Sequence, residues 1–303
     1  MKQNGTMQNG IDMLEPFVLG LEEYLKKGKT LSLFKKLPLR DENPEMIKRL
    51  STGSYLFSPC GIELNNNECN LLTLELIELL KKHLTDPNNN ISEIADIFLN
   101  EQITVNKILT QTLKNEGNEI RKQIRQLNLR EDLFTFFLIY LVRPVREQAA
   151  LHLTEGIEKL DWNYGYCPIC GHWPSLGHIN AESGTRTLWC LCCNTKWNFK
   201  RTQCAFCLNE DHKLLENINP ENEEHYFVQA CKSCKRYLKQ VRTNADLNSF
   251  QFDKIYLGTL SLDLIAEHEG YIQESVLTVR YDNTNNNELL MYRQKNSKEQ
   301  VIN

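Results

Sequence analysis

Residues 167–170 read Cys-Pro-Ile-Cys, the first of four Cys-x-x-Cys pairs that decide how the second half of this chain folds. The others are Cys190/Cys193, Cys204/Cys207 and Cys231/Cys234, and the gaps between successive pairs are 19, 10 and 23 residues. Two intervening residues let the backbone turn so that both sulfurs face one ion, and a tetrahedral site needs a second such turn. Pairing neighbours closes two loops of ribbon length. We therefore expect two ions per chain, with the first pair joined to the second and the third to the fourth.

The chemical surroundings of these cysteines favour metal over disulfide. The start of the chain, Met1 to Gly20, lacks a basic segment followed by an apolar core, so we predict a cytoplasmic location. The longest apolar run, Leu133 to Val142, has about half the length that crosses a bilayer, so we expect no stable membrane insertion. Thiols stay reduced in the cytoplasm, where clustered pairs indicate a metal site.

The size of the first ribbon gives an independent argument for metal. Residues 161–203 form a segment near the lower limit at which an apolar core alone, about 40 residues long, can hold a fold. Structural thiolate sites contribute roughly 10–16 kcal/mol in small peptides, which offsets that shortage. A redox-active pair of thioredoxin type needs a βαβ setting that short strands do not provide. A set of buried structural thiols is the other alternative.

Three side chains near the pairs could compete for the ion. Cys192 lies beside Cys193, so the ligand pair could read 190 and 192, although two intervening residues match the other three pairs. His172 and His178 follow the first pair. With eight cysteines present, we expect both histidines to pack or to form hydrogen bonds.

The first 160 residues show the apolar spacing of helices, three and four apart, over residues 22–27, 71–84, 91–113, 119–127 and 130–143. Pro144 is expected to end or kink one helix and begin the next. This pattern predicts a helix bundle, and it contains no catalytic motif. Cys60 and Cys69 are interpreted as unpaired structural cysteines.

From about residue 161 short strand-like pieces flank the cysteine turns, which predicts two-stranded ribbons. A helix is expected over 254–269, with Leu257, Leu260 and Leu264 on one face and Gly270 ending it. The sequence thus predicts an α+β fold in four parts: a helical domain over 1–160, a first module over 161–203, a second module with the C-terminal helix over 204–281, and a disordered tail over 282–303.

Five ordered features between residues 167 and 271 resemble the formate dehydrogenase accessory protein family FdhE. They are Cys167-Pro-Ile-Cys-Gly171 with Pro174, Leu188-Trp-Cys-Leu-Cys-Cys193 with Trp197, Phe199 and Arg201, the pair Cys204/Cys207, Cys231-Lys-Ser-Cys234 with Tyr237-Leu-Lys239, and Leu262-Asp263 with Ala266 and Gly270-Tyr271. The third pair departs from the family because it lacks the proline and glycine that are common there.

The resemblance implies a helical N-terminal domain followed by two rubredoxin-like modules. It also implies a cytoplasmic factor that binds the catalytic subunit of a respiratory formate dehydrogenase, a molybdenum or tungsten enzyme, and is needed for its activity. The implied metal is iron, with two ions per chain, although four thiolates suit zinc equally. Gly171 gives a rationale for iron at the first site, because a positive φ there lets backbone N–H groups point at sulfur.

Two other functions remain open at this point, a free-standing electron carrier of rubredoxin type and a zinc-ribbon protein that binds nucleic acid. The second would use a basic and aromatic strip formed by Lys196, Trp197, Phe199, Lys200 and Arg201. A net charge of −4 opposes it. The chain shows no nucleophile–base pair, phosphate loop or carboxylate dyad, so the sequence predicts that the protein is not an enzyme.

Overall fold

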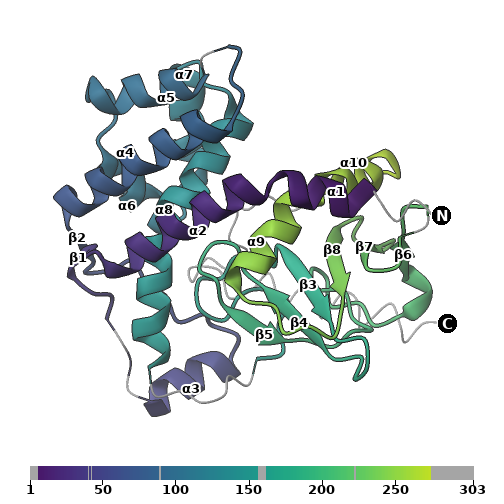
Figure 1. Ribbon diagram of the computed structural model, residues 1–303. Helices are drawn as coiled ribbons and strands as arrows, with labels where there is room; N and C mark the ends of the chain where they lie inside the picture. The colour runs from purple at the N-terminus through teal and green to yellow at the C-terminus, as the bar shows by residue number, and fades with distance from the viewer. Residues whose placement is uncertain are drawn as a thin grey trace.

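The computed structural model describes residues 6–39, 41, 43–88, 90–155, 162–221 and 223–273 (Figure 1). The predicted disordered tail lies outside these residues. The first half is helical, as predicted, and a small hairpin of β1 (Phe34–Lys36) and β2 (Glu63–Leu64) joins two of its helices. Its helices are α1 (Thr6–Met13), α2 (Glu15–Thr30), α3 (Asn43–Ser51), α4 (Asn66–His83), α5 (Asn90–Leu99), α6 (Val105–Leu113), α7 (Gly117–Gln126) and α8 (Glu131–Thr154).

The longest helix, α8, runs through Pro144 and corrects the prediction that a new helix begins there. A proline inside a helix leaves the carbonyl four residues earlier without its usual backbone donor. Here the Tyr24 hydroxyl donates to the Tyr140 carbonyl at 3.2 Å, so a side chain of α2 replaces the missing N–H. The proline ring itself packs against α2 at Gly28. Tertiary contacts therefore keep one continuous helix, which runs from the bundle to the level of the sheet (Figure 1).

A second correction concerns residues 91–113, which the apolar spacing predicted as one helical segment. The structure has two helices, because Glu101 adopts a positive φ of 53° and Gln102 N–H closes the end of α5 on the Ile97 carbonyl. Thr104 then begins α6 as an N-cap, its side chain accepting from Lys107 N–H at 3.3 Å. The apolar residues on both sides of this turn are buried, so the spacing alone could not reveal it.

The second half is built on one six-stranded sheet that unites both ribbons. Its strands are β3 (Leu176–Ile179), β4 (Arg186–Trp189), β5 (Lys196–Asn198), β6 (Leu215–Ile218), β7 (Tyr226–Cys231) and β8 (Tyr237–Arg242), in the order β5-β4-β3-β8-β7-β6. Neighbours within each ribbon are antiparallel, whereas β3 and β8 pair in parallel, with Gly177 opposite Gln240. A short 3-10 turn, His212–Leu214, precedes β6. The division of the chain at residues 160, 203 and 281 stays a prediction.

Two helices, α9 (Ser249–Gly258) and α10 (Leu260–His268), replace the single helix predicted over 254–269. The break falls at Thr259, whose side-chain hydroxyl donates back to the Ile255 carbonyl at 2.7 Å. The change of direction buries Leu262 and Ala266 and leaves Leu260 and Leu264 exposed. The prediction of one apolar face shared by Leu257, Leu260 and Leu264 was therefore wrong.

Buried ion pairs fix both of these helices. On α10, Asp263 accepts hydrogen bonds from the Lys239 ammonium at 2.8 Å and from the Tyr237 hydroxyl at 3.0 Å, both on β8. On α9, Asp253 accepts from Arg143 of α8 at 2.5 Å. Helices α1 and α2 also lie beside α9 (Figure 1). The C-terminal helices therefore connect the sheet to the helical half.

Candidate metal centres

Each Cys-x-x-Cys pair forms the same backbone turn. The N–H of the residue after the second cysteine donates to the carbonyl of the first, at 2.8–3.0 Å in all four pairs. The first cysteine's own N–H donates to the carbonyl five residues later, at 2.8–3.0 Å. The residue after the second cysteine has a positive φ in every case: 75° at Gly171, 60° at Asn194, 61° at Leu208 and 58° at Lys235. Four separate sequences thus fold into one knuckle geometry.

The third knuckle reaches this geometry without the proline and glycine that the FdhE-like pattern prefers. Leu208 takes the left-handed conformation that Gly171 takes in the first knuckle. A branched side chain rarely adopts this conformation, at a cost of roughly 1–2 kcal/mol. The Phe206 N–H also points at Cys204 Sγ, at 3.4 Å. The departure from the family pattern therefore changes the residue but leaves the turn in place.

The knuckles meet in two clusters, which we name the first cluster (Cys167, Cys170, Cys190 and Cys193) and the second cluster (Cys204, Cys207, Cys231 and Cys234). The sulfurs within each cluster all lie within 4.8 Å of one another. Sulfur pairs across the first cluster are 3.5 Å apart, and those across the second are 3.7 Å apart. A tetrahedral ion with metal–sulfur bonds of about 2.3 Å needs edges of about 3.8 Å. Both clusters therefore fit one such ion, with neighbouring pairs grouped together.

Burial governs the charge that the first cluster can carry. It raises the pKa of the Cys167 and Cys190 thiols well above the ordinary value. A thiolate in this apolar setting needs a cation to compensate its charge. Binding of a divalent ion would supply that cation and release protons from the sulfurs. The donor set thus suits a soft metal ion and no hard one.

The other candidate ligands lie outside both clusters. Cys193, not Cys192, joins the first cluster. The ring of His172 contacts the Cys170 carbonyl at 3.1 Å and Arg146 at 3.3 Å. His178 contacts the Thr243 carbonyl at 3.0 Å. Both histidines therefore form hydrogen bonds, as expected. The two remaining cysteines are free thiols, Cys60 exposed and Cys69 buried.

Residues from the helical half complete the surroundings of the first cluster. Leu56 and Phe57 donate backbone N–H groups to the carbonyls of Pro168 and Ile169, at 3.0 and 2.8 Å. Arg146 of α8 anchors this side further, because it donates to the Thr112 carbonyl at 2.7 Å as well as contacting the histidine. Sequence reasoning missed these residues. They lie far from the cysteines along the chain and carry no motif.

The aromatic residues near the clusters are buried. All four tryptophans are inside, and Trp189 stacks on Phe252 of α9 with ring centroids 5.2 Å apart. Trp197 and Phe199, which alternate along the predicted strand, both face the core. Lys200 is paired with Glu210 at 2.7 Å. The basic and aromatic strip therefore offers no exposed rings on which bases could stack, which weakens the nucleic-acid alternative.

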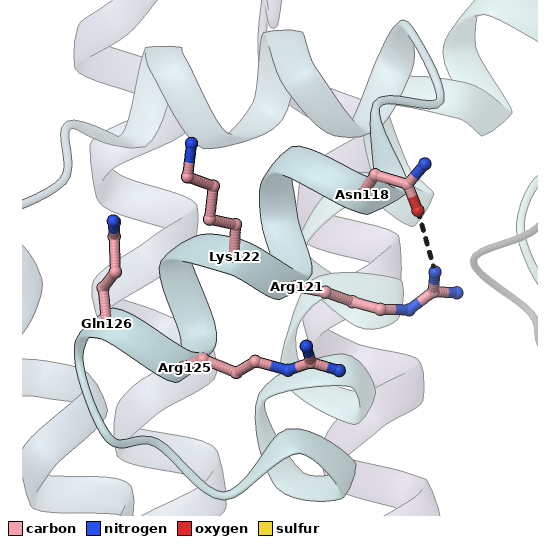
Figure 2. Close-up of a pocket in the computed structure, with 5 residues that line it drawn as sticks. All are labelled: Asn118, Arg121, Lys122, Arg125 and Gln126. Carbon is pink, nitrogen blue, oxygen red and sulfur yellow. Dashed lines mark hydrogen bonds between the residues drawn. The ribbon is translucent and has the colours of Figure 1, made fainter.

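An open hollow of about 530 Å³ lies on α7, in the helical half and away from the cysteine clusters. Figure 2 shows its lining, in which Arg121 and Arg125 point to one side of the helix and Lys122 and Gln126 to another. Asn118 accepts a hydrogen bond from Arg121 at 3.3 Å. These side chains include no nucleophile and no general base, so the hollow is a basic surface without a catalytic set.

No helix among the described residues combines the length and the apolar character needed to span a bilayer.

Comparisons with known proteins support the resemblance stated from the motifs. No protein-family model matches the chain. A protein named FdhE homolog from Aquifex aeolicus (strain VF5) is 32% identical over 146 residues, which are 47% of this chain and 50% of that protein. One of the same name from Serratia proteamaculans (strain 568) is 32% identical over 116 residues, 37% of this chain and 36% of that protein. The aligned stretches thus span half or less of these curated relatives.

The fold has a match over nearly its whole length. The crystal structure of the FdhE protein from Pseudomonas aeruginosa aligns with a TM-score of 0.53 and 19% identity, over 91% of this chain and 96% of that chain. At this identity the likeness concerns the fold. Together with the curated relatives it confirms the resemblance to FdhE proteins and the predicted fold class, with a helical N-terminal region and two four-cysteine clusters in the C-terminal half.

Proposed function

Starting from this resemblance to the FdhE proteins, we propose that the chain is an accessory factor that carries two metal-thiolate centres and binds the catalytic subunit of a formate dehydrogenase. The observation that carries the proposal is the pair of clusters, each with four sulfurs within 4.8 Å. A protein with no catalytic set of its own acts on another enzyme by contacting it. We therefore assign the chain no enzymatic activity and a cytoplasmic place of action.

In this proposal the eight clustered cysteines are the metal ligands, four to each ion. The family resemblance favours iron, while the donor set accepts zinc as well. Bound iron would supply one-electron exchange, and bound zinc would supply structural cross-linking alone. Either ion would hold the two knuckles of one ribbon together.

Metal content tests this part of the proposal. Protein purified without oxygen should contain two ions per chain, and iron would give visible thiolate charge-transfer absorption. Cys207→Ser should lower the content to one ion, whereas Cys60→Ser, at an exposed thiol outside both clusters, should leave two. A wild-type protein without bound metal would refute the two centres.

Capture of the client tests the other part. The tagged chain, produced in cells that make an active formate dehydrogenase, should recover the catalytic subunit of that enzyme. Deletion of the gene should leave the enzyme present and inactive. Recovery of no subunit together with full formate oxidation in the deletion strain would contradict the accessory function. In that case the electron-carrier alternative should be tested with the purified iron protein.

A further inference from the structure

The two clusters differ in how the protein covers them. In the first cluster every cysteine is buried, with exposed fractions of 0% for Cys167 and Cys190, 2% for Cys170 and 3% for Cys193. This cluster belongs to the same continuous apolar core as the helices of the first half. A reagent in solution therefore has no direct route to its sulfurs.

The cover over the first cluster comes from the segment that follows α3. Leu56 and Phe57 bond to the knuckle backbone at Pro168 and Ile169, and these groups are part of a buried interface. The Tyr166 hydroxyl, one residue before the first cysteine, donates to the Gly53 carbonyl at 2.5 Å. Reaching the sulfurs requires these bonds to open, so the helical half acts as a lid fixed by hydrogen bonds.

The second cluster lies closer to solvent. Cys204 and Cys231 are buried, but Cys207 and Cys234 are half-buried. The exposed residues Lys232, Ser233 and Lys235 lie between and beside its last two cysteines. A small sulfur donor can therefore approach two of the four sulfurs without any rearrangement of the fold.

We propose that the second cluster is the exchange site of this protein. Its metal is the one that a soft sulfur ligand, such as a low-molecular-weight thiol, reaches and displaces. The metal of the first cluster is retained for as long as the segment after α3 stays docked. This inference rests on the proposed presence of two ions, and it assigns them different chemistry: one centre is accessible, and the other holds the two halves of the chain together.

The rate of metal release tests the inference. Full-length protein loaded with two zinc ions is mixed with an excess of a colorimetric zinc chelator, and absorbance is followed with time. Two phases of equal amplitude should appear, one ion in each. We expect their rates to differ by at least about tenfold, the factor that the opening of one or two buried hydrogen bonds produces.

Alkylation assigns the phases to the clusters. Iodoacetamide added during release forms a carbon–sulfur bond on each freed thiolate and expels iodide. Mass spectrometry of peptides should find Cys207 and Cys234 labelled in the fast phase, and Cys167 and Cys170 only in the slow phase. Labelling of the first cluster before the second would overturn the proposal, as would release of both ions in one phase.

Two matched tyrosine variants separate the lid from general loss of stability. Tyr166→Phe removes the hydroxyl bonded to Gly53 and should speed the slow phase roughly two- to tenfold, with the fast phase unchanged. Tyr271→Phe removes a hydroxyl bonded to Glu216 on β6, beside the second ribbon, and should leave the slow phase unchanged. Equal effects of both variants on the slow phase would exclude the lid. If the chain binds no zinc at all, the proposed function fails instead, so the two failures are distinct.

Discussion

Replacement of Cys170 by Ser should unfold the first ribbon and lower the stability of the helical half without destroying it. The variant removes one of four sulfurs from the first cluster, and the ribbon depends on metal for its fold. Unfolding of the ribbon breaks the hydrogen bonds from Leu56 and Phe57 to the knuckle and the one from Tyr166 to Gly53. At about 1 kcal/mol for each of these three bonds, the helical half loses about 3 kcal/mol. For a region of this size the midpoint of thermal unfolding should fall by roughly 6–12 °C.

Far-UV circular dichroism at the helical minimum, followed during heating, measures this effect, and metal analysis of the same sample should find one ion per chain. Cys207→Ser is the matched control, because it removes one ion from the second cluster and leaves the three hydrogen bonds intact. Its helical midpoint should stay within a few degrees of the wild type. Loss of all helical signal in Cys170→Ser would refute the reasoning. Equal midpoints for the two variants would refute it too.

Three further predictions concern single sites. Lys239→Met should lower the free energy of unfolding by about 3–5 kcal/mol, because Asp263 then stays buried without its partner; urea unfolding measures this, and addition of Asp263→Leu should restore part of the loss. Asp86→Ala should lower thermal stability at neutral pH, because the backbone N–H of Ile91 donates to this carboxylate and holds its pKa below the ordinary 3.8. A carboxylate with a lowered folded pKa stabilises above that range and loses its effect as pH falls through the folded pKa, so the difference from the wild type should shrink below about pH 4; a constant difference would contradict it. Lys122→Gln, on the exposed face of α7, should change the free energy of unfolding by no more than about 0.5 kcal/mol and leave the metal content unchanged.

The comparison between sequence and structure is clearest at the cysteine knuckles. The spacing of two residues acts over a few peptide units, so the sequence could predict the turns, the grouping of neighbours and the flanking strands. The same local logic favoured Cys193 over Cys192, and the cluster contains Cys193. Leu208 shows the limit of residue type, because its left-handed backbone follows from the knuckle and contradicts its own preference.

Helix boundaries were less predictable, because side chains from distant segments decide them. Pro144 stays inside α8 since Tyr24, more than a hundred residues earlier, donates to the carbonyl that the proline leaves without a donor. Thr259 divides the C-terminal helix and turns Leu264 outward. Apolar spacing indicates that a segment is helical, but it cannot show which neighbour will satisfy a backbone group at its ends.

The sequence by itself determined that this chain has eight paired cysteines, two ribbons to hold them and a helical half in front. These features depend on contacts within a few residues. Only the tertiary structure decided that β3 and β8 join the ribbons into one sheet, and that the helical half covers the first cluster and leaves the second half-buried. The hydrogen bonds that fix this cover join residues 113 positions apart, as between Tyr166 and Gly53. No local pattern encodes a contact of that separation, because the free energy that selects it comes from packing the whole chain.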